Sequence, residues 1–128
     1  MDPPIKVLIV DDEETLRTHV AAYLEDEGFD VTTVADGETA LEVLRRNPAD
    51  VGLIDVRLPG MDGDAVILRG REICPAMKFL IHTASASYTP PAALVSCGIG
   101  QQDILVKPIL DLEVLVAAIR RLANRSTA

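Results

Sequence analysis

Five side chains of this 128-residue sequence stand where short apolar runs end, and together they could hold a cation and a transferring phosphoryl group. They are Asp11, Asp12, Asp55, Thr83 and Lys107. Three carboxylates in one crevice repel one another unless a divalent cation joins them, and all-oxygen ligands favour magnesium, with manganese as the alternative. An ammonium and a hydroxyl beside them would bind phosphoryl oxygens, since phosphoryl transfer needs mainly positioning and charge neutralisation. Asp55 would then be the nucleophile and form an acyl phosphate.

Each of these residues also has a purely structural interpretation. Asp12 could cap a helix, Thr83 could satisfy backbone groups at a strand end, and Lys107 could be a solvated charge. His82 precedes Thr83, so it should point to the opposite face of its strand as a packing or surface residue. The functional interpretation depends on finding acids, hydroxyl and ammonium together at the ends of four different segments.

The elements that must position these side chains alternate along the chain. Strands are predicted at 5–10, 29–32, 51–54, 78–83 and 103–107. Helices are predicted from apolar stripes at 16–24, 40–44 and 112–122 and over about 64–73 and 91–97. Units of this length require parallel strands with right-handed crossovers and helices on both faces of the sheet. Ligands of such sheets bind beyond the carboxyl ends of the strands, which is where the five side chains should meet.

Composition restricts the class of protein. The net charge is −8, and sixteen of the twenty acidic residues lie within residues 1–64, which argues against a nucleic-acid or anionic-membrane surface. No apolar run approaches the roughly 18 residues of a membrane span, and the start lacks a basic leader, so we expect a cytoplasmic protein. We expect one domain over 1–123, with 124–128 as a tail or linker stub. Cys74 and Cys97 lack metal-ligand spacing and should be reduced thiols, with a regulatory disulfide as the alternative.

Four segments resemble the receiver domain of two-component response regulators. They are LIVDDEE at 8–14, LIDVRLPGMDG at 53–63, HTA at 82–84 and DILVKP at 103–108. The resemblance implies a flavodoxin-like (βα)5 three-layer sandwich, with a parallel five-stranded sheet in the order 2-1-3-4-5. It implies that a phosphoryl group passes from the phosphohistidine of a histidine kinase to Asp55 in a magnesium-dependent reaction. Such a domain is a stoichiometric phosphoryl acceptor with slow self-dephosphorylation and is not an enzyme.

The resemblance also assigns metal ligands. It implies that Asp12 binds magnesium directly and that Asp11 binds it largely through water. Asp55 and the backbone carbonyl of Arg57 would complete the protein's share of the ligands. The family usually has a cis peptide before the proline that corresponds to Pro108.

Further positions concern the phosphoryl group itself. The resemblance implies that Thr83 and Lys107 bind phosphoryl oxygens and that the small side chain of Ala84 leaves the pocket open. Arg57, Ala84 and Ser85 lie at positions that modulate phosphoryl lifetime in the family. The structural interpretation of Arg57 is a solvated residue at the rim.

The sequence departs from the family at the switch. Receivers usually carry Tyr or Phe three residues before the lysine, and here that residue is Ile104, which is smaller and has no hydroxyl. The stretch from Thr83 to Lys107 is also about two residues longer than is common and contains two consecutive prolines at 90–91. Tyr88 lies in this stretch; we expect an exposed loop tyrosine, and the alternative is that it replaces the missing aromatic.

The implied partners are a sensor histidine kinase or phosphotransfer protein near the Asp55 loops, and an output domain or partner protein on the face of the fourth helix, fifth strand and last helix. A homodimer is a further alternative. Two other functions compete with the receiver. One is a pseudo-receiver that only docks partners. The other is an aspartyl-nucleophile phosphatase of the haloacid-dehalogenase kind, which would want a second Asp two residues after Asp11, where this sequence has Glu13.

Overall fold

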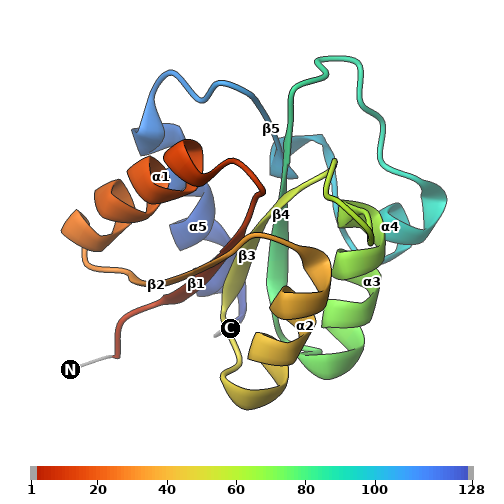
Figure 1. The fold of residues 1–128 in the computed structure, drawn as a ribbon, viewed down its shortest axis with the longest axis horizontal. Helices are drawn as coiled ribbons and strands as arrows, with labels where there is room; N and C mark the ends of the chain where they lie inside the picture. The colour runs from red at the N-terminus through yellow and green to blue at the C-terminus, as the bar shows by residue number, and fades with distance from the viewer. Residues whose placement is uncertain (1–2, 127–128) are drawn as a thin grey trace.

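A single parallel sheet forms the centre of the molecule in the computed structural model, which describes residues 3–126 (Figure 1). Its strands are β1 (Lys6–Val10), β2 (Asp30–Val34), β3 (Val51–Asp55), β4 (Lys78–Thr83) and β5 (Ile104–Val106). All four neighbouring pairs are parallel, and the spatial order is β2-β1-β3-β4-β5. The predicted flavodoxin-like topology is therefore confirmed.

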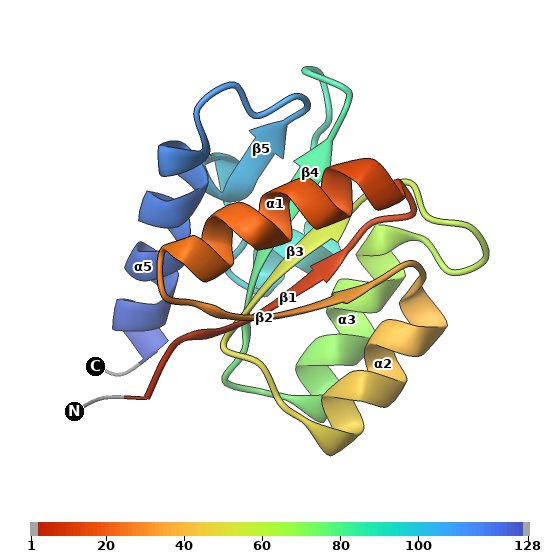
Figure 2. The same ribbon diagram turned by 60° about the vertical axis from the view of Figure 1, so that its left-hand side comes forward.

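Helices cover both faces of this sheet. They are α1 (Glu14–Asp26), α2 (Gly37–Arg46), α3 (Gly63–Ile73), α4 (Ala92–Ser96) and α5 (Leu112–Ser126). Helices α1 and α5 lie on one face and α2, α3 and α4 on the other (Figures 1 and 2). The carboxylates of Asp36 and Asp62 cap α2 and α3 by accepting hydrogen bonds from backbone amides three residues on. The helix order follows from right-handed crossovers between parallel strands.

The alternation of side chains along the strands divides the apolar interior into two cores. Val7 and Ile9 of β1 belong to the core under α1 and α5, whereas Leu8 and Val10 belong to the core under α2, α3 and α4. All five residues of β3 are buried, as expected for the central strand of a sheet that is covered on both faces. A strand held in this way is a rigid support for Asp55 at its end.

The ends of several elements differ from the predicted bounds. Strand β5 has only three residues, because Asp103 closes a 3-10 turn (Gln101–Asp103) and its carboxylate accepts hydrogen bonds from Gly100 and Arg121. Helix α5 continues through Ser126, past the boundary expected at 123, which stays a prediction as a domain limit. Within residues 3–126, no helix combines the length and apolar character that a membrane crossing requires.

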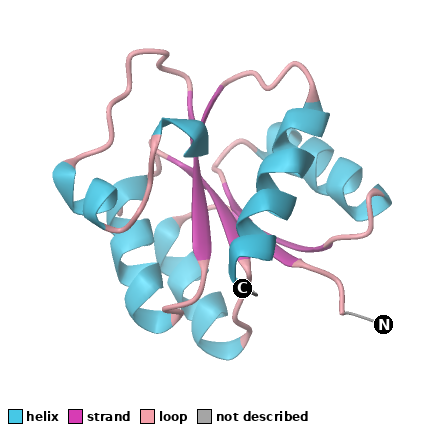
Figure 3. Cartoon of the chain, turned by 180° about the vertical axis from the view of Figure 1, so that it is seen from behind, coloured by secondary structure: helices cyan, strands magenta, loops and turns pink. Residues whose placement is uncertain are grey.

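The long connections lie where the strands end. Figure 3, which shows the molecule from behind, places prominent loops beyond one end of the strands, including the connection from β4 to α4. These loops follow the carboxyl ends of β4 and β5, so side chains from distant parts of the sequence can meet there.

Candidate functional site

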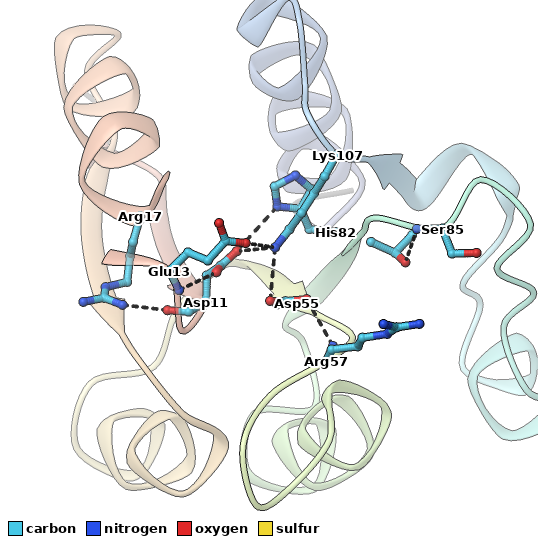
Figure 4. A network of polar contacts seen from close by, with 9 residues as sticks. Asp11, Glu13, Arg17, Asp55, Arg57, His82, Ser85 and Lys107 are labelled. Carbon is cyan, nitrogen blue, oxygen red and sulfur yellow. Dashed lines mark hydrogen bonds and ion pairs between the residues drawn. The ribbon is translucent and has the colours of Figure 1, made fainter. Parts of the chain in front are cut away.

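The carboxyl ends of the strands bring Asp11, Asp55 and Lys107 together at one edge of the sheet, which we call the crevice (Figure 4). Asp11 follows β1, Asp55 and Thr83 are the last residues of β3 and β4, and Lys107 follows β5. The parallel register sets this arrangement, because Asp55 pairs with the strand position next to Thr83. The backbone amide of Lys107 then donates to the Thr83 carbonyl at 2.7 Å, which holds the lysine beside β4.

Lys107 stands at the centre of the crevice and contacts three carboxylates. Its Nζ lies 3.0 Å from Asp11 Oδ2, 3.1 Å from Asp55 Oδ2 and 3.2 Å from Glu13 Oε1. The Lys107 side chain is only 13% exposed, so the interpretation of this lysine as a solvated charge is wrong. The side chains of Asp11 and Asp55 are almost completely buried, which strengthens their electrostatic interaction with the ammonium.

Burial and charge act in opposite directions on these groups. Burial is the largest influence on Asp55 and raises the pKa of its carboxyl, while the Arg57 amide and Lys107 act to lower it. Burial alone would lower the pKa of Lys107, but the carboxylates of Asp11 and Asp55 outweigh it and raise that pKa above its usual range. Lys107 is therefore a permanent cation at neutral pH, and a second cation would relieve the remaining repulsion between the acids.

The acidic cluster fits a divalent metal ion. Asp11, Asp12 and Asp55 each offer one carboxylate oxygen, and these oxygens lie within 4.8 Å of one another. Asp11 Oδ2 is buried and accepts no well-oriented hydrogen bond from the described residues, although Lys107 Nζ is near. Asp12 is exposed and does not cap α1, whose N-cap residue is Glu13 without a side-chain cap. Three carboxylate oxygens this close together, two of them on buried residues, are a donor set that suits a hard cation.

The loop after β3 is shaped around Asp55. The backbone amide of Arg57 donates to Asp55 Oδ1 at 3.1 Å, while the Arg57 side chain is exposed, as its interpretation as a rim residue predicted. Gly60 adopts a φ of +77°, where glycine is favoured. A Cβ at Gly63 would overlap the carbonyl oxygen of Asp55, so the close approach of α3 to β3 requires glycine at this position.

The hydroxyl of Thr83 has a backbone partner in this structure. The amide of Ser85 donates to Thr83 Oγ1 at 3.1 Å, which is the structural role that sequence reasoning had set beside the functional one. The same hydroxyl can still donate its own proton to an acceptor in the crevice. Ala84 is exposed and Ser85 is half-buried, and both directly follow Thr83 in the chain.

His82 lies closer to the acidic cluster than the sequence indicated. It is a buried packing residue on the opposite face of β4 from Thr83, as predicted, but its Nδ1 lies 3.9 Å from Asp11 Oδ2. Burial, followed by the charge of Lys107, lowers the pKa of His82 to about 4, so the imidazole is neutral at pH 7. The signal that could have indicated this contact is the register, because His82 pairs with Asp55 in the sheet.

Two further residues of the crevice were not singled out from the sequence. Glu13 reaches Lys107 from the start of α1, and Arg17 Nη1 donates to the backbone carbonyl of Asp11 at 2.7 Å. Both contacts depend on the direction of long side chains, although four consecutive acids at 11–14 already indicated an excess of negative charge.

The region around the expected switch differs from what we predicted. Tyr88 is half-buried and packs against the core under α2, α3 and α4, and its hydroxyl donates to Asp64 Oδ1 at 2.8 Å. The expectation of an exposed loop tyrosine was therefore wrong, because the loop folds back over the start of α3. Ile104 is also half-buried and packs against the same core. The peptide before Pro108 is cis, as the resemblance implied.

Comparisons with known proteins match nearly the whole chain. The family model described as "Response regulator receiver domain" matches residues 7–120. The sensory transduction protein RegX3 of Mycolicibacterium smegmatis is 37% identical over 121 residues, which cover 93% of this chain and 50% of RegX3. The transcriptional regulatory protein TrcR of Mycobacterium tuberculosis is 36% identical over 124 residues, which cover 97% of this chain and 47% of TrcR. The chain thus spans about half the length of these relatives.

Solved structures agree in fold. A CheY-like response regulator receiver domain protein from Methanospirillum hungatei superposes with a TM-score of 0.87 at 23% identity, covering 97% of both chains. A response regulator receiver protein from Sinorhizobium medicae superposes with a TM-score of 0.79 at 31% identity, covering 96% of this chain and 97% of the other. This protein chain therefore belongs to the family of response regulator receiver domains.

Proposed function

We propose that this chain accepts a phosphoryl group on Asp55 from the phosphohistidine of a sensor histidine kinase or a phosphotransfer protein. One observation carries the proposal: a buried carboxylate and a permanent ammonium lie 3.1 Å apart beside two further acids that could share a cation with it. Anions arriving at such a site meet positive charge that is already in position, which is the main requirement of phosphoryl transfer.

The transfer conserves atoms and charge. An oxygen of the Asp55 carboxylate attacks phosphorus, a new P–O bond forms, and the P–N bond to the donor imidazole breaks with its electron pair left on nitrogen. Lys107 neutralises the phosphoryl oxygens from one side. The Thr83 hydroxyl rotates to donate its proton to another of these oxygens. The hydrogen bond at 3.1 Å from the Ser85 amide to Thr83 Oγ1 should therefore change on phosphorylation.

Magnesium, or manganese in its place, would supply the positive charge that neutralises the transferring group while Asp55 reacts. Asp12 would bind the ion directly, Asp11 largely through water, and Asp55 and the Arg57 carbonyl would complete the protein ligands. The exposed carboxylate of Asp12 and the buried carboxylate of Asp11, which already pairs with Lys107, support this division. Arg57, Ala84 and Ser85 at the opening would set how readily water reaches the acyl phosphate, and thus the slow rate of self-dephosphorylation.

The output would pass through the face of α4, β5 and α5. Movement of Thr83 and Lys107 toward the phosphoryl group pulls on the ends of β4 and β5, and Ile104 at the start of β5 is the candidate switch residue. This face carries exposed Val95, Val106 and Val114, which suits contact with an output domain or a partner protein.

The test is phosphorylation by acetyl phosphate with magnesium, followed by intact-mass measurement. The wild type should gain one acid-stable, base-labile phosphoryl group, and Asp55→Asn should gain none. Asp62→Asn is the matched control, because Asp62 lies in the same loop and asparagine can keep its cap on α3. Equal phosphorylation of the Asp55 variant would overturn the assignment. An unmodified wild type would instead support a domain that only docks partners.

A further inference from the structure

We infer that Glu13 slows the acceptance of phosphoryl groups, because its carboxylate competes with the incoming group for Lys107 and repels anionic donors. Nothing in the acceptor chemistry requires this residue, which sits at the mouth of the crevice and belongs neither to the acidic cluster nor to the strand ends. The inference rests on the proposed function of Asp55.

The backbone of Glu13 is fixed while its carboxylate serves no local purpose. Its amide donates to Asp11 Oδ1 at 2.9 Å, and its carbonyl accepts the amide of Arg17 at 3.0 Å at the start of α1. Residues at a helix N-cap commonly use a side-chain oxygen to cap the first turn, but Glu13 makes no such hydrogen bond. Its side chain reaches across the crevice to Lys107 Nζ at 3.2 Å, 94 residues away in the sequence (Figure 4).

The ammonium of Lys107 has three protons, and three carboxylates contact it. Of these, Glu13 and Asp55 accept hydrogen bonds from it, so a phosphoryl group that needs this ammonium competes with them. The side chains of Asp11 and Asp55 are 2% and 7% exposed, whereas that of Glu13 is 63% exposed. Water can replace the contact of an exposed carboxylate but not that of a buried one, so Glu13 is the group that gives way.

The negative charge of Glu13 also affects how readily an anionic phosphoryl donor approaches Asp55. A donor that reaches Asp55 brings negative charge within a few ångströms of the ammonium that Glu13 contacts, and like charges at this range in a wet opening repel modestly. Removing the Glu13 charge should therefore raise the phosphorylation rate by about threefold to tenfold at low ionic strength. Because the side chain is exposed, most of this gain should disappear near 0.5 M salt.

The experiment compares the initial rates at which wild type, Glu13→Gln and Glu14→Gln take up phosphoryl groups from acetyl phosphate with magnesium. In each case an Asp55 oxygen attacks phosphorus and acetate leaves with the oxygen of the broken P–O bond. Glu14 is the matched control because it is the next residue, exposed, and makes no contact with Lys107 within the described chain. We expect the faster rate only in Glu13→Gln. The gain should be smaller with phosphoramidate, which carries less negative charge than acetyl phosphate at neutral pH.

A second measurement addresses the contact itself. In the unphosphorylated protein, the Lys107 ammonium resonance should shift in Glu13→Gln and stay unchanged in Glu14→Gln. If the wild type is phosphorylated at Asp55 but Glu13→Gln is no faster, or is slower, the inference fails and the proposed function stands. A gain that salt does not reduce, or that Glu14→Gln shares, also overturns it. If Asp55 takes up no phosphoryl group in any variant, the proposed function fails and this inference fails with it.

Discussion

The two sides of the sheet's carboxyl edge are built by different rules. On the side of β1 and β3, fixed charges meet around Lys107, and one carboxylate oxygen each of Asp11, Asp12 and Asp55 lie within 4.8 Å of one another. On the side of β4, α4 and β5, the contacts come from packing: Ile104 stands where an aromatic is usual, α4 has five residues and β5 has three. The acceptor chemistry tolerates few substitutions because opposite charges must meet, whereas a packed switch can be assembled from other side chains.

Tyr88 belongs to this packed side. It lies in the loop before α4, half-buried against the core that Ile104 also contacts. Its amide donates to Ser85, whose own amide donates to the hydroxyl of Thr83. The side of β4, α4 and β5 is thus connected to Thr83 by a short chain of hydrogen bonds, although residue 104 is not aromatic.

The largest expected effect comes from breaking the charged side. Lys107→Met should lower the rate of phosphorylation by acetyl phosphate about 100-fold or more, because no other ammonium of the described chain contacts Asp55. The free energy of unfolding without magnesium should fall by about 3 kcal/mol, since two buried carboxylates lose their partner. Initial rates and urea denaturation measure the two effects.

The control is Lys78→Met, which removes a half-buried lysine from the opposite end of β4. It should leave the phosphorylation rate within about twofold of the wild type, since screening weakens such a distant charge.

Magnesium should restore part of the lost stability in Lys107→Met, because the metal takes over the neutralisation of the acids. An unchanged phosphorylation rate in Lys107→Met would contradict the comparison, because it would show that the β1 and β3 side works without the Lys107 charge.

The charged side was also the side that the sequence predicted best. Asp55 and Thr83 end strands and Asp11 and Lys107 directly follow strands, and parallel strands end at one edge, so topology alone brings the four residues together. Contacts of long side chains depend on rotamers that no periodicity specifies. The approach of Glu13 to Lys107 and the fold of the Tyr88 loop over α3 therefore could not be predicted.

An intermediate effect is expected from His82, a buried residue whose Nδ1 lies 3.9 Å from Asp11 Oδ2 in the charged cluster. Its pKa is about 4 in the folded state against 6.5 for an ordinary histidine, so the unfolded state binds more protons below pH 6.5. Its contribution to stability is therefore complete above pH 6.5 and is lost as the pH falls toward 4. Between pH 7 and pH 5 the loss should be about 2 kcal/mol.

The comparison of wild type with His82→Leu isolates this contribution. The raised pKa of Asp55 favours folding at acid pH, but it is common to both proteins and cancels in the difference. Urea denaturation at pH 7 and pH 5 should show the larger loss in the wild type. An equal loss of unfolding free energy in the two proteins would mean that burial beside the acids does not lower the pKa of the His82 imidazole.

The smallest effect should come from the packed side. Tyr88→Phe removes only the hydroxyl that donates to Asp64, and it should lower the free energy of unfolding by about 1 kcal/mol. Asp64→Asn is the matched control, because an asparagine oxygen can still accept this hydrogen bond and should preserve most of the stability. Phosphorylation of Asp55 should stay within about twofold of the wild type in both variants, since neither residue contacts Lys107 or the acids.

The Tyr88→Phe variant also shows whether the two sides are separable. The hydrogen bonds from the Tyr88 amide through Ser85 to Thr83 persist in this variant, whereas the separate bond from the Tyr88 hydroxyl to Asp64 is lost. If the loop only transmits the phosphorylated state, loosening Tyr88 in this way should change amide protection between Thr83 and Pro108 after addition of beryllofluoride and magnesium. The rate of acceptance would be unaffected. A tenfold slower acceptance in Tyr88→Phe would instead show that the packed loop positions Thr83 for the chemistry, and the division between a charged and a packed side would not hold.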